Sequence, residues 1–121
     1  HLLIKTLEKR NAIIFYSGDH GEFLGENGMF GHDHGMEYPE ERRVPLLVWV
    51  SEKYKKLNPE KYKAILQNHK KFGENLKKEE LLDENKNLSH DNLFYSVLDC
   101  AGIEGKIITQ SMGICSPIQK N

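Results

Sequence analysis

The sequence contains no long apolar run. No stretch approaches the roughly 20 residues that a membrane-spanning helix requires, and the start of the chain lacks a signal-peptide pattern. Hydrophobic residues make up 38% of the 121 residues, and the mean hydropathy is −0.63. These values indicate a soluble chain with a modest core, long enough for one domain.

A surplus of charge of either sign is also missing. Lys and Arg number 17 and Asp and Glu number 18, which leaves a net charge of −1. Domains that bind nucleic acid through general electrostatic attraction carry a basic surplus. We therefore expect no nucleic-acid partner. No internal repeat is visible either.

Cysteine is scarce, with Cys100 and Cys115 as the only two. They could pair with each other, remain free, or find partners outside this sequence. Cys100 lies within an apolar helical pattern, which favours a buried thiol. The chain opens with HLLIKTLEKR, without Met and within a helical pattern, so we expect a fragment of a longer protein.

Two short apolar runs, residues 11–16 and 44–50, have the composition of strands buried on both faces. Helical patterns flank them at residues 1–9 and 89–102, where Gly102 is placed to end the second helix. The alternation of helix and strand predicts an α/β fold with a mainly parallel sheet. The tail after residue 104 has room for at most one short strand.

Residues 52–87 are rich in Lys and Glu and contain helical stretches, with Pro59 suited to a first turn. This segment is interpreted as a charged helical insertion that faces solvent rather than lipid or nucleic acid.

The first apolar run ends in the stretch GDHGEFLGENGMFGHDHG, residues 18–35. Asp19 and His20 follow the strand directly, at the end of a strand where functional groups collect in open α/β sheets. A carboxylate and an imidazole suit zinc, which accepts both oxygen and nitrogen ligands. Gly18 and Gly21 on either side are interpreted as residues that permit a sharp turn.

His32 follows twelve residues after His20, across a loop that contains Gly25, Gly28 and Gly31. Such a loop could bring His32 back over the end of the strand. The alternative is a turn with a capping carboxylate and an exposed imidazole. His69, in the charged helical region, and His90, between capping candidates, are interpreted as ordinary residues.

Three ordered blocks carry a family resemblance: IIFYSGDHGEFLGENGMFGH, YPEERRVPLLVW and SHDNLFYSVLDCAGI. Over residues 1 to about 50 and 88 to 115, the chain resembles the C-terminal part of bacterial phosphoethanolamine transferases. These belong to the sulfatase-like branch of the alkaline phosphatase superfamily. The resemblance implies that residues 1–121 form the C-terminal portion of a three-layer α/β/α catalytic domain.

Members of this family are inner-membrane enzymes with a periplasmic catalytic domain and an N-terminal membrane region. They transfer phosphoethanolamine from phosphatidylethanolamine to lipid A or another surface acceptor, through a zinc-activated threonine. The resemblance implies that Asp19 and His20 are zinc ligands and that His32 contacts the phosphoryl group or a second zinc. The nucleophilic threonine and the other ligands have no counterpart in this chain.

Several positions depart from the family pattern or stay open. Phe23 stands where a small hydroxyl residue is usual, and Arg42 where Gln is common. His34 is a second candidate for the role of His32, which is chosen on its spacing. Glu22 either orients a ligand or belongs to the loop surface.

Alternative functions remain open within and outside the family. A sulfatase or a phosphoglycerol transferase would use the same superfamily fold, and the isolated chain could be an inert fragment. A chain with two ligands and no nucleophile is expected to be inactive and to hold zinc poorly. Exposed strand edges make self-association plausible.

Overall fold

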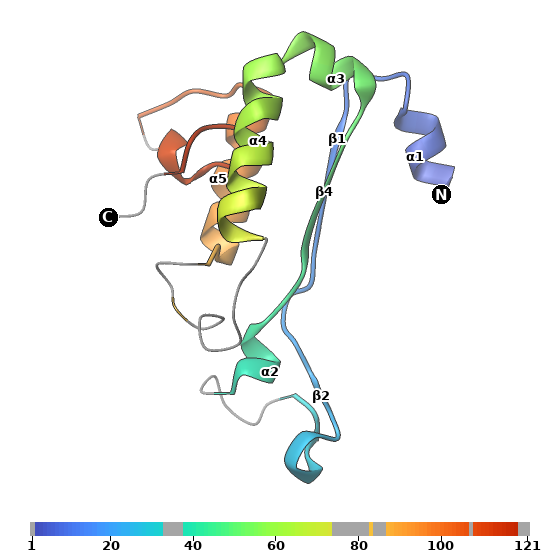
Figure 1. The fold of residues 1–121 in the computed structure, drawn as a ribbon, viewed down its shortest axis with the longest axis vertical. Coiled ribbons are helices and arrows are strands. Elements are labelled where there is room, and N and C mark those ends of the chain that lie inside the picture. The colour runs from blue at the N-terminus through green and yellow to red at the C-terminus, as the bar shows by residue number, and fades with distance from the viewer. Residues whose placement is uncertain (1, 33–37, 74–82, 84–86, 107, 119–121) are drawn as a thin grey trace. The chain divides into compact units, whose positions relative to one another are not determined.

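The structure, a computed structural model, describes residues 2–32, 38–73, 83, 87–106 and 108–118. The chain divides into a helical unit, residues 1–13 and 49–121, and a hairpin unit, residues 14–48. Figure 1 shows its elements, which are α1 (Leu2–Leu7), β1 (Ile13–Ser17), β2 (Phe23–Leu24), η1 (Glu26–Gly28), β3 (Phe30–Gly31), α2 (Pro39–Arg42), β4 (Leu46–Val50), α3 (Glu52–Leu57), α4 (Pro59–Phe72), α5 (His90–Ala101) and η3 (Gln110–Met112).

The two apolar runs form β1 and β4, which are hydrogen-bonded neighbours. The Ser51 amide after β4 donates to the carbonyl of Ala12 before β1 at 3.0 Å. At the other end, Gly18 lies beside Val44. The strands therefore run in opposite directions, as they can be followed in Figure 1.

The helices and strands confirm the α/β class. A mainly parallel sheet can include an antiparallel strand, and mixed sheets of this kind are common. The unbroken apolar runs indicated buried strands, but an apolar run carries no information on the direction of a strand. For that reason the antiparallel pairing of β1 and β4 could not be read from them.

The predicted helix boundaries rest on local signals that the structure confirms. Pro59 occupies the first turn of α4. Gly102 ends α5 in the left-handed region, with φ 74°, and its amide donates to the carbonyls of Asp99 and Leu98. Ser51, which was not among the predicted boundaries, caps the start of α3, where its hydroxyl accepts from the Tyr54 amide. Each residue satisfies or removes a backbone group that a helix end leaves unpaired.

The core of the helical unit lies between α3, α4, α5 and the tail. Its buried apolar side chains are Tyr54, Ala64, Ile65, Phe72, Cys100, Ile114, Cys115 and Ile118. α3 and α4 lie in the segment predicted as a charged helical insertion, and one face of α4 is buried in this core. The solvated description therefore applies to the charged face of α4. Residues 74–82 and 84–86 of the segment lie outside the described residues.

The tail is held by side chains rather than by a sheet, and its described residues contain η3 but no strand. The Asn68 amide donates to the carbonyls of Ile114 and Ser116 at 3.0 and 2.8 Å, and its oxygen accepts from Ile118.

Cys100 and Cys115 form a disulfide that joins α5 to the tail. The buried thiol favoured for Cys100 was wrong. An apolar helical pattern indicates burial of a cysteine but says nothing about a partner fifteen residues away in an irregular segment.

Among the described residues, none of the helices combines the length and the apolar character that crossing a bilayer demands.

Candidate metal centre

β1 ends at Ser17 and delivers Asp19 and His20 to the surface of the hairpin unit. The His20 amide donates to Asp19 Oδ1 at 3.1 Å, and its ring Nδ1 lies 2.9 Å from the Gly21 carbonyl. A carbonyl oxygen only accepts, so Nδ1 carries a proton in this contact, and in the neutral ring the lone pair is then on Nε2. This is the tautomer that a histidine needs in order to bind a metal through Nε2.

Asp19 lies beside this nitrogen, with Oδ2 at 3.9 Å from His20 Nε2 and a side chain that is 91% exposed. Ligand atoms placed about 2.1 Å from a tetrahedral zinc lie about 3.4 Å apart. A small rotation of either side chain would bring the two atoms to that separation. The pair fits a shared cation by donor type and by reach.

The β2–β3 hairpin brings His32 to the same place. Its antiparallel register pairs Phe23 with Gly31 and Leu24 with Phe30. Continued by one residue, this register sets Glu22 opposite His32, and Glu22 Oε1 lies 3.3 Å from His32 Nδ1. The rings of His20 and His32 lie 4.3 Å apart between their centroids.

The loop glycines thus return His32 to the end of the strand, as the sequence predicted. Gly25, Gly28 and Gly31 have φ values of 125°, 76° and 79°, which favour glycine. The role of His32 as a catalytic group stays a prediction, as do the ligand roles of Asp19 and His20. His34, the other candidate, lies outside the described residues.

Across the described part of the chain, one group of residues could hold a metal ion: His20, Glu22 and His32, with ligand atoms within 4.8 Å of one another. All three are exposed. Two imidazole nitrogens and a carboxylate oxygen form a donor set that suits zinc. His69 in α4 and His90 in α5 do not belong to the group.

Glu22 is the site residue whose place the sequence left undecided. Its carboxylate lies among the candidate ligand atoms and contacts the ring of His32. The position of Glu22 two residues after His20 was the one signal in the sequence, because residues two apart in an extended chain share a face. The pairing of Glu22 with His32 follows from the hairpin register, which the structure supplies.

Gly21 is required by a close approach, which corrects the interpretation of Gly18 and Gly21 as residues with special turn angles. Neither has a positive φ. A Cβ built on Gly21 would lie 1.9 Å from the Glu40 carbonyl oxygen and 2.9 Å from that of Arg43, and the Gly21 amide donates to the Glu41 carbonyl at 2.8 Å. α2 therefore packs directly on the turn that follows Asp19 and His20.

The electrostatics of this turn keep Asp19 ionised. The pKa of the Asp19 carboxyl lies below its ordinary value of 3.8. The backbone amides of Asp19 and His20 lower it most, and the neighbouring imidazoles of His20 and His32 lower it less. An ionised carboxylate is the form that binds a metal.

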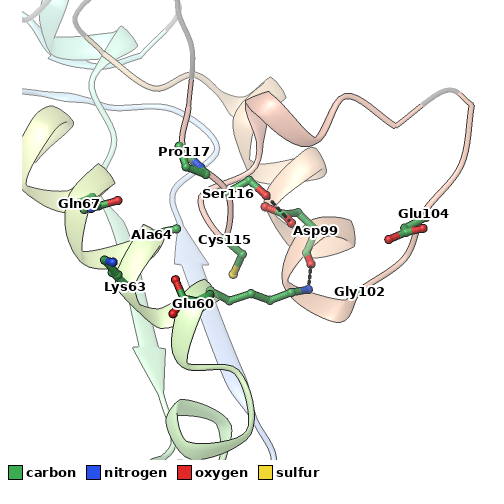
Figure 2. A pocket seen from close by; sticks show the side chains of 11 residues that line it. Glu60, Lys63, Ala64, Gln67, Asp99, Gly102, Glu104, Cys115, Ser116 and Pro117 are labelled. Carbon is green, nitrogen blue, oxygen red and sulfur yellow. Dashed lines mark hydrogen bonds between the residues drawn. The ribbon is translucent and has the colours of Figure 1, made fainter.

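A concave surface lies in the helical unit, with a volume of about 460 Å³ (Figure 2). Asp99 lines it, with Oδ1 accepting from the Ser116 hydroxyl at 3.1 Å and its backbone carbonyl accepting from the Lys61 ammonium. Asp99 Oδ2 makes no hydrogen bond and is buried. None of the predicted site residues lines this surface.

Residues 2–103 match the family model described as Sulfatase. The chain is 34% identical over 101 residues to the Kdo(2)-lipid A phosphoethanolamine 7''-transferase of Escherichia coli K12, covering 83% of the chain and 16% of that protein. It is 32% identical over 110 residues to the phosphoethanolamine transferase EptA of the same strain, covering 88% of the chain and 17% of that protein.

Among solved structures, the chain resembles the C-terminal periplasmic domain of the phosphoethanolamine transferase EptC from Campylobacter jejuni. The TM-score is 0.63 at 22% identity, over 98% of the chain and 34% of that domain. This likeness supports the fold alone. The chain spans about a sixth of the length of the curated relatives given above.

Proposed function

This chain belongs to the sulfatase family, and we propose that it forms the C-terminal part of the catalytic domain of a zinc-dependent phosphoethanolamine transferase. The donor would be phosphatidylethanolamine and the acceptor lipid A or another surface hydroxyl, with a phosphothreonine intermediate on a residue outside this chain. One observation carries the proposal: the Asp-His pair at the end of β1 meets His32 across the hairpin, in a chain whose relatives are named phosphoethanolamine transferases.

The family implies a metal ion, and the residues of the site fit zinc. Asp19 and His20 would hold it, through a carboxylate that stays ionised and an imidazole whose Nδ1 proton is held by the Gly21 carbonyl. When bound, zinc supplies a Lewis acid that lowers the pKa of a neighbouring hydroxyl and offsets the charge of a phosphoryl group.

His32 and Glu22 would act on the phosphoryl side of the site. An imidazole that donates to phosphoryl oxygens stabilises the charge that develops there in the transition state. Glu22 Oε1, at 3.3 Å from Nδ1, would fix the ring and direct Nε2 outward. This makes Glu22 a positioning residue and His32 the residue that contacts the substrate.

The disulfide supports a location for this domain. Structural disulfides persist in oxidising compartments such as the bacterial periplasm and are rare in the cytosol. The Cys100–Cys115 bond is therefore consistent with a periplasmic catalytic domain, which we propose to be tethered to the inner membrane by a region outside this chain.

The test is lipid mass spectrometry of cells that express the longer polypeptide containing this chain. Asp19→Ala is expected to abolish phosphoethanolamine addition, because it removes a charged ligand. Glu8→Gln, which changes an exposed carboxylate in the turn after α1, serves as the control. Removal of metal with a chelator should abolish transfer, and zinc should restore it.

An unchanged phosphoethanolamine pattern in Asp19→Ala would reject the function. The alternative function is that of a sulfatase or a phosphoglycerol transferase of the same superfamily. Release of sulfate from sulfate esters, or transfer of phosphoglycerol, would assign that function in place of phosphoethanolamine transfer. The Sulfatase description of the family model is the observation that keeps this reading open.

A further inference from the structure

The outer face of the β2–β3 hairpin displays two large apolar side chains. Leu24 and Phe30 are paired across the hairpin and are 79% and 71% exposed. Phe23, on the opposite face, is 1% exposed and lies edge-on to the Tyr38 ring at 5.3 Å. Strand alternation thus buries Phe23 and presents Leu24 and Phe30 together on one exposed face.

Hydrogen bonds in the hairpin tip fix the positions of Leu24 and Phe30. The Leu24 amide donates to Glu26 Oε2 at 2.6 Å, and the Met29 amide donates to the Glu26 carbonyl at 2.9 Å. Gly25, Asn27 and Gly28 have the positive φ values of the turn. These bonds fix the tip that carries Leu24 on one side and Phe30 on the other.

The charges around this apolar pair narrow the choice of partner. No Lys or Arg occurs between Arg10 and Arg42, and the charged side chains of the hairpin are Glu22 and Glu26. Such a surface repels anionic lipids and nucleic acid. Its carboxylates complement an ammonium group, and its apolar pair suits the boundary between head groups and acyl chains.

We propose that Leu24 and Phe30 form a lipid-contact surface that seats the hairpin on a bilayer containing ethanolamine head groups. The inference deepens the proposed function and rests on it, because the donor there is a lipid. Glu22 and His32 continue the same two strands, so a hairpin seated at the lipid boundary holds the candidate site at the depth of the head groups. The carboxylate of Glu26 receives the ethanolamine ammonium.

The test is flotation of the chain with phosphatidylcholine vesicles, with and without phosphatidylethanolamine. We expect the chain to float with vesicles and to bind the ethanolamine-containing ones more tightly, since a primary ammonium donates hydrogen bonds and a quaternary one does not. Vesicles that contain phosphatidylglycerol should bind least. Leu24→Ser with Phe30→Ser should weaken partition by at least about tenfold, because two apolar side chains leave the boundary.

The matched control is Leu57→Ser with Leu66→Ser, which removes two comparably exposed leucines from α3 and α4. It should float like the unchanged chain. Phe30→Trp gives a second measurement in a folded variant, whose added fluorescence should shift to the blue with vesicles.

Absence of flotation, or flotation that survives loss of both side chains, would overturn the proposal. A dimer that dissociates in Leu24→Ser with Phe30→Ser, without vesicle binding, would assign the surface to a second copy and also overturn it. Equal binding to both head groups would reject the ammonium contact. Vesicle binding that persists while lipid mass spectrometry shows no transfer would reject the proposed function and leave this inference standing.

Discussion

At the scale of the residue, the candidate site depends on the side chains of Asp19 and His20 and on the absence of a side chain at Gly21. Asp19 and His20 are recognisable because their side chains have a chemistry of their own and directly follow a strand. Gly21 is different, because its importance lies in the space that it leaves for the Glu40 carbonyl oxygen. The Glu40 carbonyl oxygen belongs to α2, and no local sequence pattern predicts that α2 packs on this turn.

Gly21→Ala should damage both stability and metal binding. The added Cβ would lie 1.9 Å from a backbone oxygen, so α2 or the turn must move. We expect a loss of about 1–3 kcal/mol in the free energy of unfolding, the range for overpacking, measured by urea denaturation. Gly18→Ala is the control, because its Cβ would meet Val44 Cγ1 at 3.4 Å, an ordinary contact. Equal stability of the two variants would contradict the close approach.

Asp99 predicts a pH dependence of stability. Burial raises the pKa of its carboxyl above the ordinary 3.8, against the opposing Ser116 hydroxyl and Lys61 charge. The folded state therefore binds this proton more tightly than the unfolded state. The contribution of Asp99 is fully present below pH 3.8 and is lost as pH rises through the folded-state pKa.

Denaturation across acidic to neutral pH should show this difference. Asp99→Asn keeps an acceptor for Ser116 and removes the titration, so the stability of the variant relative to the unchanged chain should improve as pH rises. A difference between the two proteins that stays constant over this range would show that Asp99 titrates normally.

At the scale of the element, helix ends were predictable and strand partners were not. Pro59 and Gly102 act on backbone groups within their own turn, so their effect is contained in the local sequence. The pairing of β1 with β4 depends on residues more than thirty positions apart in the sequence. Ala12 and Ser51, which are hydrogen-bonded to each other, are an example. The place of Glu22 opposite His32 likewise follows from a register that only the folded hairpin displays.

Ser51 joins β1 to α3 through a single hydroxyl. Its Oγ accepts from the amides of Tyr54 and Ala12 at 3.1 and 3.2 Å and donates to the Arg10 carbonyl at 2.7 Å, and the residue is 1% exposed. Ser51→Ala should cost about 1–3 kcal/mol, because it removes a helix cap and leaves buried groups unsatisfied. Thermal denaturation measures this, with exposed Lys53→Ala as the control, expected within about 0.5 kcal/mol of the unchanged chain. A Ser51→Ala melting curve that matches this control would show that the hydroxyl is dispensable.

At the scale of the whole molecule, the helical unit depends on its tail. Ile114 and Ile118 are buried there although the tail has no periodic pattern, because Asn68 and the disulfide hold it. Contacts that span about fifty residues leave no trace in local composition. This explains why the sequence predicted no more for the tail than one short strand, although Ile114 and Ile118 belong to the core.

Reduction of Cys100–Cys115 should therefore destabilise this unit. A closed loop of fifteen residues corresponds to about 3 kcal/mol in the chain-entropy account. Urea denaturation with and without a thiol reductant should show a lower midpoint in the reduced chain. The urea midpoint of the variant with both cysteines replaced by alanine should not change with the reductant. A midpoint of the unchanged chain that does not fall on reduction would contradict the estimate.

The pairing of Leu24 with Phe30 has one more consequence, for how this segment can change its length during evolution. Inserting or deleting a single residue between Glu22 and His32 would slide β2 past β3 by one residue and turn the side chains of β2 to the opposite side. Phe23 would then face outward, Leu24 inward, and the carboxylate would lose the imidazole across from it. Lineages that carry this hairpin should tolerate substitutions in its tip far more readily than changes in its residue count.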